Sequence, residues 1–354
     1  MPAEAVSRRI ATWLYVCAGL VFVMVVLGGL TRLTHSGLSI VEWKLVSGIL
    51  PPLSDAAWQA SFEAYQRFPE YRQLNRGMTL AEYKDIYWLE YLHRLLGRAI
   101  GLVYFVPFVY FAATAKLGRP LLTKLGGLLV LGGAQGVLGW LMVASGLVER
   151  PDVSHYRLAA HLGLAVVIFG ALFWVALDLR TGNPLPTLPL QAGGGRPIEG
   201  REGGGRRLAG VALALTFVTI LSGALVAGLD AGLLYHTFPL IEGQWLPAGM
   251  LAETPWYLNF VENRMTVQFQ HRWLALVTAA LVALLWWRGQ GSDRARHWGA
   301  LALGLALLQV GLGIATLLLV VPITLGVLHQ ANALLLFGAT VALVHSLSRR
   351  EAAP

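Results

Sequence analysis

Charge and cysteine are both scarce in this chain of 354 residues. Only 13% of the residues are charged, whereas roughly 25% is usual for a soluble globular protein. Cys17 is the one cysteine, which excludes an intrachain disulfide and a metal site built from cysteines. The net charge is +8, but the basic residues lie in short segments between apolar runs, unlike the continuous basic face of a nucleic-acid-binding protein. Nucleic acid is therefore not an expected partner.

Long apolar runs are abundant instead, and 56% of the residues are hydrophobic. A helix of about 20 apolar residues crosses the hydrocarbon core of a bilayer. The first run lacks a small-residue cleavage site, so we expect it to stay as a helix and not to be removed as a signal peptide. The sequence predicts an all-α polytopic membrane protein of about eight transmembrane helices, near 11–30, 87–112, 122–143, 156–178, 208–228, 266–287, 297–319 and 323–347.

Basic residues gather at the chain ends and in every second connection between these runs. Cytoplasmic loops of membrane proteins carry an excess of Lys and Arg. We therefore expect both termini to be cytoplasmic and the long connections 31–86 and 229–265 to face outward. The basic residues behind this prediction are Arg8, Arg9, Lys116, Arg119, Lys124, Arg180, Arg196, Arg201, Arg206, Arg207, Arg288, Arg294, Arg296, Arg349 and Arg350.

Two connections have features of their own. The segment 181–207 is rich in Pro, Gly and Arg without an apolar period, which predicts a cytoplasmic linker between a first half, 1–180, and a second half, 208–354. In the outer connection 31–86, Trp58, Phe62 and Tyr65 share a helical face behind a candidate N-cap, Ser54. This helix is expected either to lie on the outer membrane surface, to pack on the bundle as a lid, or to dock a partner.

The two halves resemble each other in helix order and in motif position. EYLHR opens the second expected helix and FQHR lies in the sixth, Gln135 and Gln309 precede glycine-rich faces, and HYRLAAHL is matched by VLHQANALLLF. Helices one and five run in the same direction across the membrane, so an axis along the membrane normal would relate the halves. We predict two pseudo-symmetric four-helix bundles.

Four of the nine histidines occupy equivalent places in this repeat: His93 and His161 in the first half, His271 and His329 in the second. A histidine inside a span must face a cavity, a partner or a metal. Two histidines from facing helices at one depth suit axial ligation of a haem iron. A packing role is the alternative for any single one of them. The other histidines, His35, His155, His236, His297 and His345, lie near the ends of the expected helices and are not expected to be ligands.

An arginine directly follows one histidine of each pair. Arg94 and Arg272 are candidates for binding haem propionates, or for reaching the outer interface with their charged heads. Three residues before the same histidines, the first half has Glu90 and the second has Gln268. A site that differs from its twin by one ionisable group is a candidate for chemistry, which makes Glu90 the candidate catalytic residue. The alternative is an ion pair between Glu90 and Arg94.

Several segments taken together resemble the haem A synthase family: GGLTRLTHSGLSIVEWK, EYLHR, QGVLGWLMVASGL, HYRLAAHL, FQHR and VLHQANALLLF. The resemblance covers nearly the whole chain, and the long outer connection without paired cysteines resembles the proteobacterial and mitochondrial branch. It implies oxidation of the C8 methyl of haem O to the formyl group of haem A, for use by cytochrome oxidase. It further implies that His271 and His329 bind a haem b cofactor, that His93 and His161 hold the substrate haem, and that Glu90 is needed for activity.

The competing interpretation is a di-haem b-type membrane electron-transfer protein that leaves both haems unaltered. A transporter is disfavoured, because the ionisable residues gather near one face and form no path across the membrane. The resemblance implies an inner-membrane location with the haem sites toward the periplasmic side. Haem O synthase, an electron donor in the membrane and a second copy of the chain are the candidate partners.

Overall fold

The computed structural model describes residues 3–44, 47–115, 117–148, 151–181, 202–288 and 292–348. In these ranges the chain is helical, and eight helices are long and apolar enough to cross a membrane. They are α1 (Ala3–Leu33), α4 (Leu80–Thr114), α5 (Arg119–Gly146), α6 (His155–Arg180), α7 (Glu202–Gly228), α8 (Arg264–Trp287), α9 (Asp293–Leu318) and α10 (Ile323–Leu347). The protein is thus an all-α, multi-pass membrane protein, as predicted.

Three spans, α4, α8 and α9, begin before their apolar runs, each directly after a residue whose side chain caps the helix. α4 starts at Leu80, several residues before the expected start near 87. The Thr79 side chain accepts a hydrogen bond from the Glu82 backbone N–H, and the Glu82 carboxylate accepts one from the Thr79 backbone N–H. This reciprocal capping box satisfies backbone donors that would otherwise lack partners, so the helix extends beyond the hydrocarbon-length run.

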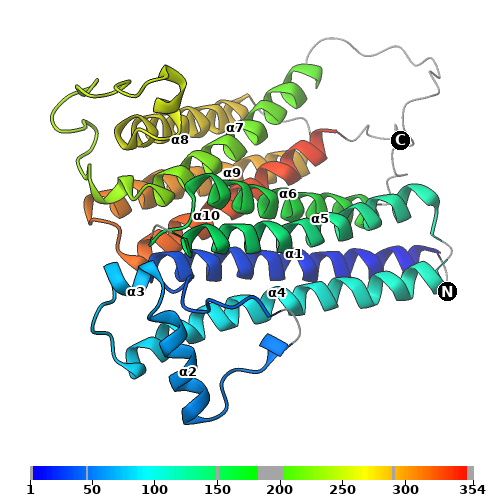
Figure 1. The fold of residues 1–354 in the computed structure, drawn as a ribbon. Helices are drawn as coiled ribbons and strands as arrows, with labels where there is room; N and C mark the ends of the chain where they lie inside the picture. Colours follow the sequence, from blue (N-terminus) through cyan, green and yellow to red (C-terminus); the bar gives the residue numbers. More distant parts are fainter. Residues whose placement is uncertain are drawn as a thin grey trace.

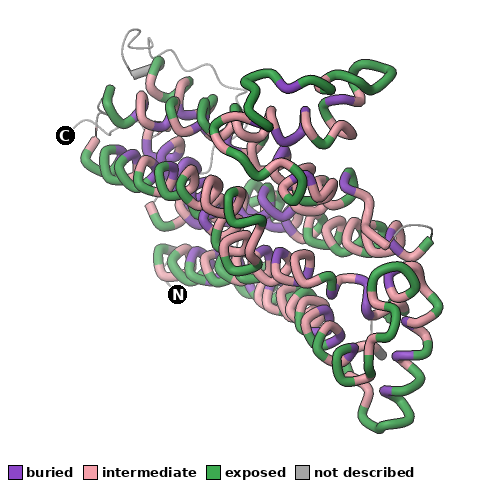
Figure 2. The backbone as a smooth tube through the Cα atoms, turned by 90° about the vertical axis from the view of Figure 1, so that its left-hand side faces the viewer, coloured by how far each residue is buried: buried purple, intermediate pink, exposed green. Residues whose placement is uncertain are grey.

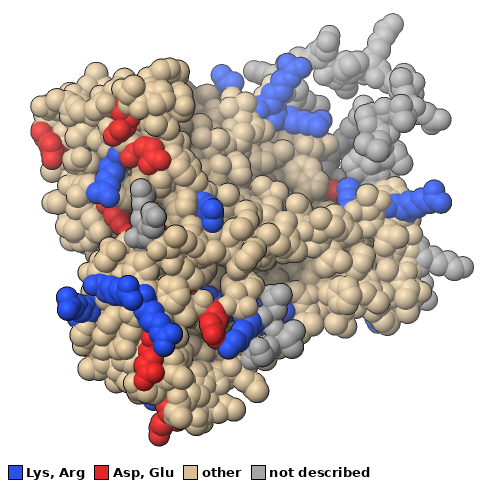
Figure 3. All heavy atoms as spheres, in the orientation of Figure 1, with Lys and Arg blue, Asp and Glu red and all other residues tan. Residues whose placement is uncertain are grey.

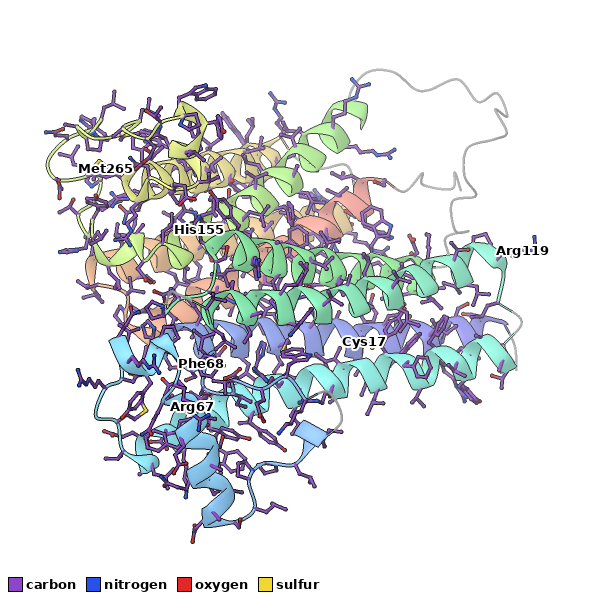
Figure 4. All side chains as sticks on the ribbon, viewed as in Figure 1. Cys17, Arg67, Phe68, Arg119, His155 and Met265 are labelled. Carbon is purple, nitrogen blue, oxygen red and sulfur yellow. The ribbon has the colours of Figure 1, made fainter. Side chains whose placement is uncertain are left out.

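Most short elements gather at one end of the bundle, which we call the loop end (Figure 1). They are α2 (Asp55–Tyr65), α3 (Pro69–Gln73), η2 (Ala231–Leu233) and η3 (Trp256–Phe260), while η1 (Ser47–Ile49) lies farther along the bundle beside α4. Phe68, His155 and Met265 lie toward this end and Arg119 at the opposite one, the terminal end (Figure 4). Charged side chains on the visible face concentrate toward the two ends and leave a nearly uncharged band between them (Figure 3), as expected for a membrane-spanning surface.

Two spans, α6 and α10, form the centre of the bundle. In each of them 56% of the apolar window is buried, against 6% in α5 and 11% in α9. Figure 2 shows buried backbone along the inner helices and exposed backbone on the outer ones. Helices exposed in this way have apolar surfaces suited to lipid, because lipid tails are as apolar as their side chains.

Reciprocal contacts between a phenylalanine and a glycine join α6 to α10. A Cβ atom on Gly170 would lie 2.9 Å from Phe337 Cε1, and one on Gly338 would lie 3.3 Å from Phe169 Cε1. In the sequence, Phe169 comes eight residues after His161 and Phe337 comes eight residues after His329, and a glycine directly follows each phenylalanine. Residues that correspond in the predicted repeat therefore make matching contacts across the middle of the molecule.

A buried ionic cluster joins the same two helices near the terminal end. His345 Nε2 lies 3.0 Å from Asp178 Oδ1, and Lys124 Nζ lies 3.6 Å from Asp178 Oδ2. Asp178 and His345 are each only 3% exposed. A charge buried in apolar surroundings is costly unless it is paired. The pairing therefore ties together α5, α6 and α10, and the sequence analysis did not identify it.

The outer connection forms the lid that was one of its expected alternatives. Ser54 caps α2 by accepting a hydrogen bond from the Ala57 N–H. The face of α2 that carries Trp58, Phe62 and Tyr65 is buried against α4, where the Trp58 and Tyr87 ring centroids lie 4.8 Å apart. Of the expected linker 181–207, residues 182–201 lie outside the described part of the chain, and α7 begins inside the expected range, at Glu202.

We expect Gly170→Ile to destabilise the bundle by about 1–3 kcal/mol, because the new side chain must displace Phe337 from a packed core. Gly101→Ile is the matched control, since a Cβ atom at Gly101 meets no atom within 4 Å. The thermal midpoints of both variants, purified in the same detergent, measure the difference. Equal midpoints would contradict the proposed importance of this contact.

Candidate functional site

His271 on α8 and His329 on α10, the second-half pair, face each other. Their ring centroids are 6.4 Å apart and their planes are inclined by 82°. A metal lies about 2 Å from a coordinating imidazole nitrogen, so two imidazoles on one iron have centroids roughly 6 Å apart. The two rings therefore have the separation expected of two imidazoles that would hold one iron between them, so these residues fit a haem iron.

His93 on α4 and His161 on α6, the first-half pair, also come from different helices. Their rings differ in orientation. His161 turns its Cε1 edge toward the neighbouring helix α5, whereas His93 turns its Nε2 toward α1. The ring arrangement thus differs between the two halves, and the pairing of His93 with His161 stays a prediction.

A glycine on a neighbouring helix lies opposite each of the four histidines. At three of these glycines a Cβ atom would lie 3.0 Å from an imidazole Cε1, and at the fourth 3.2 Å from an Nε2. Any larger side chain would push the ring away, so glycine is what allows the helices to approach around each imidazole. The glycine and histidine partners are Gly28 with His93, Gly139 with His161, Gly223 with His271, and Gly313 with His329.

A hydroxyl group orients one ring of the second-half pair. Ser222 Oγ lies 2.8 Å from His271 Nδ1 and donates its own proton to the Thr219 carbonyl. Because that proton is used, Ser222 accepts the hydrogen bond from His271 Nδ1–H. The Nε2 lone pair is then available for a metal. The corresponding position in the first half, one residue before Gly28, is Leu27, which cannot serve in this way.

A glutamine amide lies against the other ring of each pair. Gln135 Nε2 is 3.2 Å from His161 Nδ1, and Gln309 Nε2 is 3.1 Å from His329 Nδ1. Both glutamines precede, by one helical turn, the glycine that faces the same histidine. The repeat predicts that these glutamines are equivalent, but nothing in the sequence pointed to their contacts with the histidines.

Arg94 fastens the first long connection to the site. Its guanidinium donates hydrogen bonds to the carbonyls of Ile40, at 2.7 Å, and Glu42, at 2.9 Å. Its Nη2 also lies 2.6 Å from Glu90 Oε1. The arginine therefore holds the backbone of the outer connection beside the helix that carries His93.

Arg272 does the same for the second long connection. It donates hydrogen bonds to the carbonyls of Tyr235, at 2.9 Å, and Thr237, at 2.8 Å, and to Gln268 Oε1, at 2.7 Å. Its Nε is buried and has no hydrogen-bond partner among the described residues. Each arginine side chain therefore binds loop carbonyls, and the alternative that it only extends its charged head to the outer membrane interface does not describe either one.

Glu90 is 3% exposed, and residues of this chain contact both of its oxygens. Oε2 accepts hydrogen bonds from Ser39 Oγ, at 2.8 Å, and from the Ile40 N–H, at 2.7 Å, while Oε1 pairs with Arg94. The ion pair considered as an alternative is therefore present, but it is buried and not at the surface.

A second buried carboxyl, Glu70 on α3, was missed. It is 3% exposed, and Tyr65 donates a hydrogen bond to its Oε2 at 3.1 Å. Burial, reinforced by the nearby carboxylates of Glu90 and Asp152, raises the pKa of Glu70 to about 8. Burial also raises the pKa of Tyr65. Nothing in the sequence signalled this carboxyl, because its burial depends on how the lid folds over the loop end.

Three of the histidines that were not expected to be ligands interact with other groups of the protein. His155 Nε2 lies 3.5 Å from Glu262 Oε2, His297 Nδ1 lies 2.6 Å from the Asp293 carbonyl, and His345 belongs to the ionic cluster at the terminal end. The four paired histidines therefore stay the candidates for binding iron.

The fold and these histidine pairs define a multi-pass membrane protein whose helices present paired imidazoles between closely packed spans. Residues 11–341 match the family described as cytochrome oxidase assembly proteins, and the chain belongs to this family.

Curated relatives resemble the chain over nearly its whole length. The heme A synthase of Nitrosospira multiformis is 50% identical over 351 residues, covering 98% of this chain and 95% of the relative. The heme A synthase of Rhodospirillum centenum is 51% identical over 352 residues, covering 99% and 91%. That of Parvibaculum lavamentivorans is 49% identical over 346 residues, covering 98% and 96%.

We expect Ser222→Ala to weaken haem retention by the second-half pair about tenfold, because groups that orient a ligand histidine typically contribute 10–100-fold to metal affinity. The rate of haem loss to an excess of apomyoglobin, followed by absorbance, measures this effect. Ser222→Thr keeps the hydroxyl and should restore slow loss. If Ser222→Ala lost haem no faster than the wild type, the hydroxyl would not orient this ligand.

Proposed function

We propose that this chain is a haem A synthase, which oxidises the C8 methyl of haem O to the formyl group of haem A in the membrane. The observation that carries the proposal is the placement of four repeat-equivalent histidines, each beside a glycine, in two pairs between spans. The relatives that match nearly the whole chain support the same reaction.

In this proposal His271 and His329 hold a haem b cofactor, for which their ring separation of 6.4 Å is suited. When bound, haem b would supply an iron centre that exchanges single electrons. His271 presents Nε2 because Ser222 occupies Nδ1, and Gly223 and Gly313 leave room for the rings. The residues here bind and orient the cofactor and exclude water.

His93 and His161 hold the substrate haem in the same proposal. Arg94 and Arg272 hold the connections that cover the two sites in place. The buried Nε–H of Arg272 has no partner among the described residues and is free to donate a hydrogen bond to a haem propionate. Haem O would enter from the bilayer, since its porphyrin and side chain are apolar. In this proposal the C8 methyl is hydroxylated twice and then loses water. Each hydroxylation takes one oxygen atom from an oxidant such as dioxygen, whose other atom is reduced to water by two electrons from the electron donor in the membrane.

Glu90 is the proposed catalytic residue. The loop N–H of Ile40 and the Arg94 guanidinium hold its carboxylate in place. A fixed negative charge in a site of low polarity stabilises positive charge that develops on a substrate carbon. Glu90 lies one helical turn before His93 on the same face of α4, so it would act at the edge of the first-half site.

We also propose that the chain lies in the cell inner membrane with both termini in the cytoplasm. The excess of Lys and Arg at the terminal end supports this orientation. The loop end, with both histidine pairs beneath it, would then face the periplasm.

Extraction of the haems from the purified chain, followed by chromatography, tests the proposed reaction. Haem O, a hydroxylated haem or haem A beside haem B would support the synthase. Haem B alone, in an amount that fills both sites in cells able to make haem O, would favour the di-haem electron carrier instead.

We expect His271→Ala and His329→Ala to abolish the low-spin haem b spectrum, because either change removes an axial imidazole. His93→Ala and His161→Ala should keep that spectrum and lose haem O retention. Absorbance spectra and haem content of the purified variants provide the measurement. Loss of the same haem from all four variants would rule out two separate sites.

We expect Glu90→Gln to fold, retain haem b and accumulate haem O or a hydroxylated haem with little haem A. The change removes the charge at constant size, and the second half already pairs Arg272 with a glutamine at this position. Arg94→Gln is the comparison variant. It breaks the same ion pair but keeps the Glu90 carboxylate, so it separates the loss of the ion pair from the loss of the carboxylate. Near-normal haem A output from Glu90→Gln would overturn the catalytic assignment.

A further inference from the structure

The two glutamines beside the histidine pairs differ in how their amide oxygens are satisfied. In the second half, Asn332 Nδ2 donates a hydrogen bond to Gln309 Oε1 at 2.7 Å and another to the Leu305 carbonyl at 2.9 Å. Asn332 comes three residues after His329. The acceptor in this half is therefore used within the protein.

The equivalent acceptor in the first half, Gln135 Oε1, differs from that of Gln309. Gln135 Oε1 is buried and receives no hydrogen bond from the described residues. The position three residues after His161 is Leu164, which has no donor to offer. An acceptor without a donor is costly in a buried site, so a donor from a bound molecule is the expected complement.

A 180° rotation of the Gln135 amide would not give its oxygen a suitable hydrogen-bond donor. Gln135 Nε2 donates to the His161 carbonyl at 3.0 Å and lies 3.2 Å from His161 Nδ1. Exchanging the two amide atoms would put the Gln135 oxygen against the His161 carbonyl oxygen, and neither of these two atoms can donate a hydrogen bond. The oxygen therefore faces away from the His161 backbone and is fixed there.

This difference between the halves matches a difference between the two haems of the proposed function. Haem b has no hydroxyl group on its periphery. Haem O has one on its isoprenoid side chain, and its C8 methyl gains another when it is first oxidised. A hydroxyl is the donor that an unpaired amide oxygen requires.

We infer that Gln135 is a specificity-determining residue of the first-half site, whose Oε1 accepts a hydrogen bond from a hydroxyl group on the porphyrin periphery. The inference rests on the proposed function and adds to it the feature by which the site distinguishes its substrate from the cofactor. Two hydroxyls share this chemistry, the one that haem O brings and the one formed at C8.

Leu164→Asn tests the inference without touching Gln135. It copies the second half, so the new amide can donate to Gln135 Oε1 and to the Leu131 carbonyl, and the acceptor is used up. Gln135→Leu removes the acceptor outright. Val167→Asn is the matched control, because it adds the same amide to α6 at a position that is 42% exposed.

The measurement is the binding of haem O and of haem B, each titrated by absorbance into chain that already carries haem b in the second half. We expect the preference for haem O over haem B to be about tenfold smaller in Leu164→Asn and Gln135→Leu than in the wild type and Val167→Asn, the typical effect of one hydrogen bond. The low-spin haem b spectrum reports that both variants are folded.

A second arm identifies which hydroxyl is bound. If the preference for haem O survives in both variants but they release hydroxylated haem that the wild type retains, as chromatography of the medium would show, the partner is the hydroxyl formed at C8. If the variants bind haem O and haem B as the wild type does and release no hydroxylated haem, the inference is wrong.

The proposed function can fail separately. A wild-type chain that prefers haem O but makes no haem A in cells would contradict the synthase and leave the role of Gln135 standing. A wild-type chain that makes haem A, together with variants that keep the wild-type preference for haem O and release no hydroxylated haem, would support the synthase and contradict the role of Gln135.

Discussion

The site depends on one packing constraint, the fit of an imidazole between two transmembrane helices. A histidine in a span has no water to bind, so its ring must be enclosed by neighbouring helices. Each of the four paired histidines lies against a glycine of another helix, at distances that leave no room for a larger residue. Those contacts set how closely the helices approach, and the aromatic and ionic contacts between α6 and α10 hold the same arrangement nearer the terminal end.

The two halves share this scaffold and differ in the groups around it. In the second half Ser222 pairs with His271 Nδ1 and Asn332 with Gln309 Oε1, so both groups have partners within the chain. In the first half leucines stand at both equivalent positions, Leu27 and Leu164. An amide oxygen satisfied within the chain suits a resident cofactor, whereas the unsatisfied oxygen of Gln135 suits a molecule that arrives, reacts and leaves.

Sequence reasoning found the spans and the histidine pairs because both depend on local or repeated signals. Apolar runs of bilayer length mark helices wherever they occur, and His93 and His271 are recognisable because each opens a similar motif. The loop contacts of Arg94 could not be found, because they depend on where the carbonyl of Ile40 lies after a connection without repeats has folded. Glu70 was missed for the same reason, since it becomes buried only when α3 packs over the loop end.

The same loop contacts show a difference between the halves, since the first half has the carboxylate of Glu90 where the second has the amide of Gln268. Both arginines hold their connections through backbone carbonyls and through a side-chain oxygen one turn earlier on the helix. In the second half that oxygen belongs to the neutral amide of Gln268, so holding the loop does not require a charge. A buried carboxylate costs more to desolvate than an amide, yet Glu90 is present with Ser39 and Ile40 donating to it. The second half thus holds its loop with a neutral amide where the first half has Glu90, and this difference agrees with the catalytic role proposed for Glu90.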